Sequence, residues 1–207
     1  MTQAAARARG KETRQAMLGA VMPILISMLR GVNVTGFNKI PMEALRQLYE
    51  SLGLRGAQSY IQSGNVVFRT DVKDLTALAS RIEDAIEKKF GFRPGVTVRT
   101  TAELKEVIRK NPFAKRKEIE PAKLQVHFFL TISPSAELQG AILRLKGDHP
   151  EELVFGSREL YIYFPDGQGR SKLWPALDRA LKKSATGRNL NTVTKLLAIA
   201  EQMENSR

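Results

Sequence analysis

The sequence predicts an α+β protein in which one order of secondary-structure elements occurs twice. Runs with strand-like alternation and runs with helical spacing follow one another as strand, helix, strand, strand, helix, strand. The same order returns after a charged, proline-bounded stretch, although no sequence repeat is visible. This order is typical of the split βαβ or ferredoxin-like unit, an antiparallel sheet with two helices on one face. We therefore expect two tandem ferredoxin-like (βαββαβ) subdomains with antiparallel sheets and extra helices.

The first half opens with an apolar run at residues 23–30, which predicts a buried strand. A turn-rich loop then leads to Pro41, a residue suited to the first turn of a helix, and Gly53 ends that helix. The apolar residues of this helix share one face: Leu45, Leu48, Tyr49 and Leu52.

Two short strands, AQSYIQ and NVVFRT, flank the turn dipeptide Ser63-Gly64 and predict a hairpin. A helix is expected from Asp71 until Gly91, and the segment GVTVRT supplies the next strand. The apolar residues that predict this helix are Leu75, Leu78, Ile82, Ile86 and Phe90. Thr100, with Glu103 three residues later, has the spacing of a capping box and predicts a short further helix.

The charged stretch NPFAKRKEIEPAK, bounded by prolines, is expected to connect the two halves. The expected organisation is a flexible basic extension or misassigned start at residues 1–21, a first subdomain plus helix at 22–110, a linker at 111–122, and a second subdomain with a C-terminal helix at 123–207.

The second half repeats the plan. KLQVHFFLT alternates as a strand, Ser133-Pro134 starts a helix, and LVF and LYIYF flank the turn GSRE. A helix at about 171–183, a short strand near ATGRN and a last helix at about 190–203 complete it. One face of each sheet needs a cover beyond its own two helices. Either the two halves cover each other or those faces are left for a ligand.

The composition narrows the function classes. A formal charge of +12 and a pI near 10.1 favour anionic partners such as nucleic acid, phosphorylated metabolites or an anionic membrane surface, although a basic protein can also be merely soluble. The absence of cysteine excludes disulfides and thiolate sites and fits a reducing, cytoplasmic compartment. With two histidines and no paired ligand spacing, we expect no metal site and no cofactor.

The amino terminus has the charge pattern of a signal peptide, because basic residues precede the apolar run MLGAVMPILISML. No small-residue cleavage site follows, and PILISMLRG is typical of a central strand, so a strand is favoured. Met22 is then a candidate start alongside Met1. The run is too short and too interrupted to span a bilayer.

The stretch LYIYFPDGQGRSKLW places a glycine turn between a strand and a helix. Ser171 can cap the helix, while Arg170 and Lys172 lie beside helix-start N–H groups that favour a phosphate or carboxylate. The pattern lacks the order of a nucleotide phosphate-binding loop and the third glycine of a dinucleotide fingerprint. A capped helix without any ligand explains it equally well.

Three other segments supply candidate ligand-binding residues. The loop LRGVNVTGFNKIPM and the hairpin YIQSGNVVF offer amide and cationic donors, and ATGRNLNTVTKLL places an arginine at the start of the final helix. Turn formation, capping and simple solvation are the competing interpretations. The candidates are Arg30, Asn33, Asn38, Lys39, Gln62, Asn65, Arg188, Asn189 and Lys195.

Catalytic patterns are poorly represented. His127 lies on the strand face opposite Leu124, Val126 and Phe128, and a structural role is favoured over that of a base. No serine–histidine–acid arrangement can be assigned from spacing, so whether the protein is an enzyme stays open.

Five ordered motifs, LRGVNVTGFNKIPM, YIQSGNVVF, NPF, YFPDGQGRSKL and GRNLNTVTKLLAIA, resemble the bacterial family DUF1697 over residues 23–200. The resemblance implies a small cytoplasmic bacterial protein with two ferredoxin-like halves and no established activity. Thr35 and Phe37 depart from the family's usual GINVGGKNKVPM, which removes a glycine and a cation from that loop.

The leading hypothesis is a binding module for a phosphate-bearing ligand, either nucleic acid or a nucleotide, acting as a monomer or homodimer. The aromatic RNA-binding motif of ferredoxin-like domains is absent from SGNVVFRT, so the fold analogy adds little. A small-molecule enzyme with its site between the halves, or a structural or partner-binding protein, are the alternatives.

Overall fold

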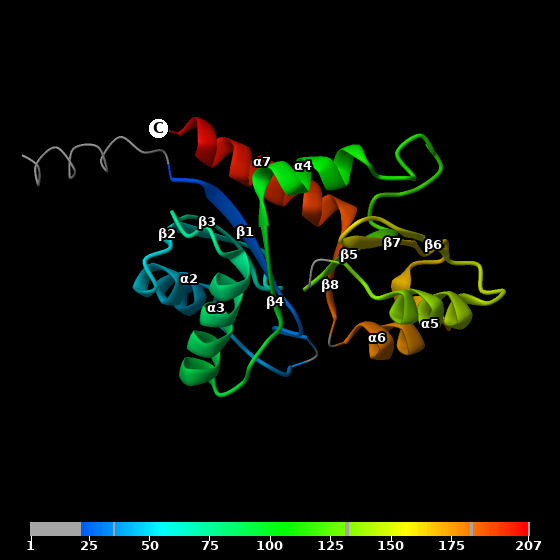
Figure 1. The fold of residues 1–207 in the computed structure, drawn as a ribbon, viewed down its shortest axis with the longest axis horizontal. Coiled ribbons are helices and arrows are strands. Elements are labelled where there is room, and N and C mark those ends of the chain that lie inside the picture. The colour runs from blue at the N-terminus through cyan, green and yellow to red at the C-terminus, as the bar shows by residue number, and fades with distance from the viewer. Residues whose placement is uncertain (1–21, 35, 131–132, 183, 207) are drawn as a thin grey trace, which may run out of the picture.

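The structure, a computed structural model, describes residues 22–34, 36–130, 133–182 and 184–206. The expectations about the basic extension at residues 1–21 and about Thr35 therefore fall outside the described residues. Within the described part, two four-stranded sheets and their helices stand side by side, with two helices lying across both (Figure 1).

Both sheets have the ferredoxin-like strand order. The first is ordered β2-β3-β1-β4 and the second β6-β7-β5-β8, with every neighbouring pair antiparallel. The predicted α+β fold with two tandem ferredoxin-like halves is confirmed. The first half comprises β1 (Ile24–Leu29), α2 (Met42–Ser51), β2 (Arg55–Tyr60), β3 (Asn65–Arg69), α3 (Leu75–Phe90), β4 (Val96–Thr100) and α4 (Thr101–Arg109). The second comprises β5 (Leu124–Phe129), α5 (Ala136–Lys146), β6 (Glu152–Phe155), β7 (Glu159–Tyr163), a 3-10 turn (Gln168–Arg170), α6 (Trp174–Leu181), β8 (Ala185–Asn189) and α7 (Leu190–Asn205).

Three helices begin later than the periodicity predicts, two of them because a nearby side chain caps them. Asp74 accepts hydrogen bonds from two backbone N–H groups and starts α3 at Leu75, four residues after Asp71. Ser135 does the same for α5. The glycine turn takes up residues 168–170 as a 3-10 turn, so α6 begins at Trp174 and not at 171.

The outer face of each sheet packs on its own helices. In the first half, Leu25 and Phe68 pack against α2 and α3, where Leu45 and Ile82 are wholly buried. In the second half, alternate strand residues such as Ile162 pack against α5 and α6. These two clusters supply the burial expected of independent ferredoxin-like units.

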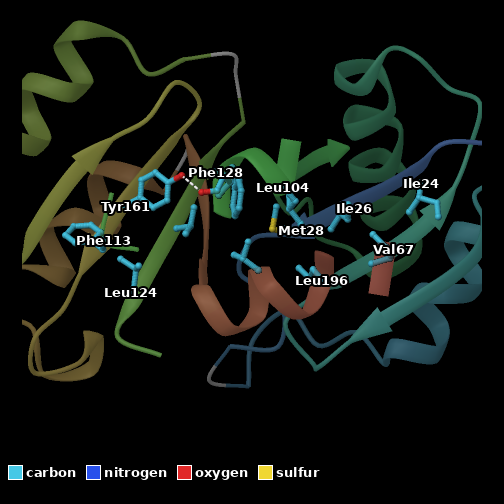
Figure 2. Close-up of a cluster of buried hydrophobic side chains, with 14 of the residues drawn as sticks. Ile24, Ile26, Met28, Val67, Leu104, Phe113, Leu124, Phe128, Tyr161 and Leu196 are labelled. Atoms are coloured by element: carbon cyan, nitrogen blue, oxygen red, sulfur yellow. Dashed lines mark hydrogen bonds between the residues drawn. The ribbon is translucent and has the colours of Figure 1, made fainter. Parts of the chain in front are cut away.

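The inner faces of the two sheets share one core (Figure 2). It is completed by α4 from the first half and α7 from the second, which pack on each other, and α7 contacts strands of both sheets. Phe113 and Ile119 of the predicted linker are buried in the same core, and the Tyr161 hydroxyl donates to the Val107 carbonyl of α4 at 2.8 Å. Of the two arrangements open to the sheets, the halves therefore cover each other.

Two buried arginines join the halves in a reciprocal manner. Arg99 of β4 faces Ile26 across the sheet and donates to the Phe129 carbonyl at 2.7 Å. Arg188 of β8 faces Val126 in the equivalent register and donates to the Leu29 carbonyl at 2.7 Å. Phe129 and Leu29 are the last residues of β5 and β1, so each arginine holds the same point of the opposite half.

We predict that Arg99→Met destabilises the protein by about 2 kcal/mol, because it leaves the buried carbonyl of Phe129 without this donor. Urea unfolding followed by circular dichroism would measure it. Arg179→Met, at an exposed position of α6, is the matched control and should change stability by less than about 0.5 kcal/mol. Equal losses in the two variants would contradict the prediction.

Candidate functional site

A cleft of about 550 Å³ lies where the loop after β1 meets the second half. Its walls come from four places: that loop, the middle of β5, the glycine turn with α6, and β8. The lining residues are Arg30, Gly31, Val34, Gln125, His127, Gln168, Gly169, Trp174, Asp178, Lys182, Thr186, Gly187 and Arg188. The volume falls in the range of small-molecule sites.

Arg188 carries a buried positive charge into this cleft, with 9% of its surface exposed. Its guanidinium donates to the Asn65 Oδ1 at 2.5 Å and to the carbonyls of Leu29, Ser63 and Gly187, each at 2.7 Å. All four acceptors are neutral. Burial, followed by the charge of Arg30, lowers the pKa of Arg188 to about 10, so the group stays protonated at neutral pH.

Two further cations share the cleft. Arg30 donates to the Ala185 carbonyl at 2.6 Å and forms an ion pair with Asp178 at 2.7 Å. Lys182 is exposed on the end of α6. Because Asp178 is the one carboxylate among the described lining residues, the cleft has an excess of positive charge.

His127 forms part of the cleft wall and is almost fully buried, with 1% exposure. Its ring lies 5.4 Å from that of Trp174, and neither ring nitrogen has a hydrogen-bond partner among the described residues. Burial, and then the charges of Arg30 and Arg188, lower the pKa of His127 to about 3. The imidazole is therefore neutral at physiological pH.

Gly187 provides the space for this imidazole. The register places Gly187 directly opposite His127, and a Cβ at that position would lie 2.5 Å from the His127 Cε1. The equivalent pair in the first half is Ser27 and Val98, and there Ser27 is satisfied by a 2.8 Å hydrogen bond with the Tyr49 hydroxyl. The two halves thus differ in chemistry at this position, where the cleft forms.

The predicted polar residues of the first loop mainly support the cleft. Asn33 donates to the carbonyls of Ile40 and Gln62, and Asn38 donates to Gly31, which closes the loop on itself. Both asparagines have positive φ. Asn65 is fully buried and orients Arg188. The side chains of two further candidates, Gln62 and Lys39, are exposed.

Arg170, Ser171 and Lys172 line a separate hollow of about 260 Å³ on the other side of the glycine turn. The Ser171 hydroxyl donates to the buried Glu151 and accepts from the Trp174 amide at 3.0 Å, so it does cap the start of α6. Arg170 and Lys172 are exposed at its rim. Gln168 and Gly169 of the same turn face the interlobe cleft, so the turn forms a wall of both.

The remaining candidates lie on α7. Asn189 is its cap and accepts from the Thr192 amide at 2.9 Å, whereas Lys195 is exposed one turn further on. In the part of the chain that the structure describes, no group of three or more metal-ligating side chains occurs. The same described residues form no helix long and apolar enough to cross a membrane.

The site contains residues that the sequence patterns did not single out, above all Trp174, Asp178, Lys182 and Gly187. Helical spacing explains Asp178 and Lys182 as ordinary surface positions of α6. Gly187 did carry a signal, because an isolated glycine inside a strand often marks a close approach of another group.

Comparison with known protein families identifies the family to which this chain belongs. The family model described as "Protein of unknown function (DUF1697)" matches residues 22–161, more than half of the chain. The chain belongs to the DUF1697 family. The resemblance noted in its sequence motifs is thereby confirmed. A search of curated proteins finds no match.

A solved structure shares the family architecture. It is described as that of conserved bacterial protein SP0830 from Streptococcus pneumoniae and aligns with a TM-score of 0.67 at 22% identity. The alignment covers 86% of this chain and 99% of that one. At this identity the likeness supports the fold alone.

Because the pKa of folded His127 is lowered, we predict that the free energy of unfolding depends on pH. The unfolded chain binds a proton at its histidines near pH 6.5, whereas folded His127 does so only near pH 3, so stability falls as pH drops through this window. Between pH 7.5 and pH 5 the loss due to His127 should be on the order of 2 kcal/mol. Denaturant unfolding at both pH values should show it for the native protein and not for His127→Gln; equal pH dependence would contradict it.

A second prediction follows from the close approach of Gly187 to the imidazole of His127. We expect Gly187→Ala to destabilise this DUF1697 protein by about 2 kcal/mol, because the new methyl group collides with the imidazole of His127. Adding His127→Ser should recover most of that loss in a double-mutant cycle of unfolding free energies. Gly169→Ala is the matched control, since a Cβ there meets nothing within 4 Å. Additive effects of the first two changes would overturn the prediction.

Proposed function

We propose that this protein binds a small phosphate-bearing molecule in the interlobe cleft. The observation that carries the proposal is the environment of Arg188, a buried guanidinium that lines the cleft and, among the described residues, hydrogen-bonds only to neutral groups. A buried charge without a counter-ion costs free energy, and a bound anion would offset that cost. Arg30 and Lys182 add positive charge around the same space.

A small molecule fits this cleft better than a polynucleotide does. Ferredoxin-like RNA-binding domains use the open sheet face, but here α4 and α7 occupy the inner faces and the other helices occupy the outer ones. Arg188, the buried cation of this cleft, is recessed between the halves and forms no ion pair among the described residues, whereas Lys182 beside it is exposed. Non-specific nucleic-acid binding depends instead on exposed cations that follow the phosphate backbone.

Binding fits better than catalysis for the same residues. Asp178 is held by Arg30, and His127 is too weak a base at neutral pH to accept a proton readily. Among the described lining residues, no nucleophile lies hydrogen-bonded to a base. Electrostatic recognition of an anion is what the geometry supports.

Trp174 offers a direct test, because it is the only tryptophan of the chain and lines the cleft. We expect its fluorescence to change saturably on titration with at least one of pyrophosphate, ribose 5-phosphate and the nucleoside monophosphates. Lys182→Ala should weaken that binding about fivefold or more, because it removes a charge from the cleft.

Lys172→Ala and Lys195→Ala are matched controls, since each removes one exposed lysine outside the cleft. Both should leave the affinity within about twofold. The proposal fails if no small phosphate binds at millimolar concentration. It also fails if single-stranded RNA or duplex DNA binds much more tightly than every small probe and Lys172→Ala weakens binding as much as Lys182→Ala.

A further inference from the structure

The fold alone does not explain why a histidine is buried at position 127. A buried imidazole that finds no hydrogen-bond partner for either nitrogen among the described residues loses the hydrogen bonds it made to water in the unfolded chain. The equivalent position of the first half carries Ser27, whose hydroxyl is satisfied. An apolar side chain at position 127 would avoid this loss of hydrogen bonds. The presence of an imidazole is therefore explained if a bound ligand supplies its hydrogen-bond partner.

The surroundings of His127 reserve space for its ring. Gly187 lacks the Cβ that would strike the imidazole, and Trp174 packs against it from α6. A phosphate dianion only accepts hydrogen bonds, so it can pair with the N–H of a neutral imidazole but not with its acceptor nitrogen, whereas a base edge offers groups that suit either nitrogen. The cleft therefore presents two kinds of surface, a cationic one and a neutral one that both donates and accepts.

We propose that the cleft recognises the heterocyclic base of a nucleotide, with His127 hydrogen-bonding to the edge of the base while the cations hold the phosphate. The inference rests on the proposed function and names its substrate class. A base edge carries donors and acceptors and can pair with one imidazole nitrogen, because the two nitrogens point to opposite sides of the ring. The side-chain amides of Gln125 and Gln168 in the same cleft offer further donors and acceptors to the base.

Access to His127 requires a local movement. Because 1% of its surface is exposed, the base reaches the imidazole by displacing the half-buried Trp174 or Gln125. The Trp174 ring packs against both His127 and Phe164, with centroid distances of 5.4 and 5.8 Å. Its displacement would change its fluorescence, and its flat ring is a surface on which a base can stack.

The test compares ligands that share a phosphate and differ in the base. Trp174 fluorescence titrations should give affinities for one or more of the four nucleoside monophosphates at least about tenfold tighter than for ribose 5-phosphate. In His127→Phe, which keeps a ring without nitrogens, that preference should fall to within about threefold while the ribose 5-phosphate affinity stays unchanged.

Nitrogen NMR of the native protein gives a second readout that does not depend on a variant folding. The chain has two histidines, and His149 lines the separate hollow beyond the glycine turn. The preferred nucleotide should shift the imidazole nitrogens of His127 and leave those of His149 in place, whereas ribose 5-phosphate should shift neither. Equal affinity for ribose 5-phosphate and every nucleotide, or an unmoved His127, would overturn the inference and leave phosphate binding in the cleft standing.

Discussion

The reciprocal hydrogen bonds of Arg99 and Arg188 are the interactions on which the arrangement of the two halves depends. Each guanidinium leaves its own sheet and binds the terminal carbonyl of the first strand in the other half, Phe129 or Leu29. Each also donates to the carbonyl of the residue before it. Burial lowers the pKa of both arginines to about 10, which leaves them charged at neutral pH. The apolar core that α4 and α7 complete supplies most of the buried contact between the halves. The two arginines add directional hydrogen bonds that fix how one half sits on the other.

This pseudo-symmetry explains why the larger cleft, of about 550 Å³, lies beside Arg188, whereas the hollows beside Arg99 measure about 230 and 240 Å³. Around Arg99, the equivalent positions carry Val98 and Ser27, and Ser27 is satisfied within its own half. Around Arg188 they carry Gly187, which leaves room for a ring, and His127, whose two nitrogens have no partner among the described residues. Both arginines thus make the same contact between the halves, but the larger cleft accompanies Arg188 alone among the two. The residues of the proposed site lie where the two halves depart from internal symmetry.

The fold could be predicted well from the sequence, because helices and strands are indicated by the spacing of residues that are close together in the chain. Period-2 and helical spacing located both sets of strands and helices, including the short strand at ATGRN. Helix starts were less certain, since Asp71 and Asp74 are both good caps and only the backbone decides between them. Arg30 and Arg188 were candidates for anion binding on local grounds, and the structure brings them to one cleft. Trp174, Asp178 and Lys182 could not be found this way, because helical spacing marks them only as positions of α6 and the pairing of the halves decides their role.

The protein has a net charge of +12, and its exposed cations and its buried cations act differently on an anionic ligand. Lys39, Arg170, Lys172 and Lys195 are exposed, so salt screens them, and they favour polyanions without selecting any one of them. Arg188 is buried, and salt screens its field much less. An anion held at the surface would therefore lose affinity steeply as salt rises, whereas one held in the cleft would keep part of it. The residual affinity at high salt reports on Arg188, so the location of the charge, more than its amount, decides which ligand this protein can distinguish.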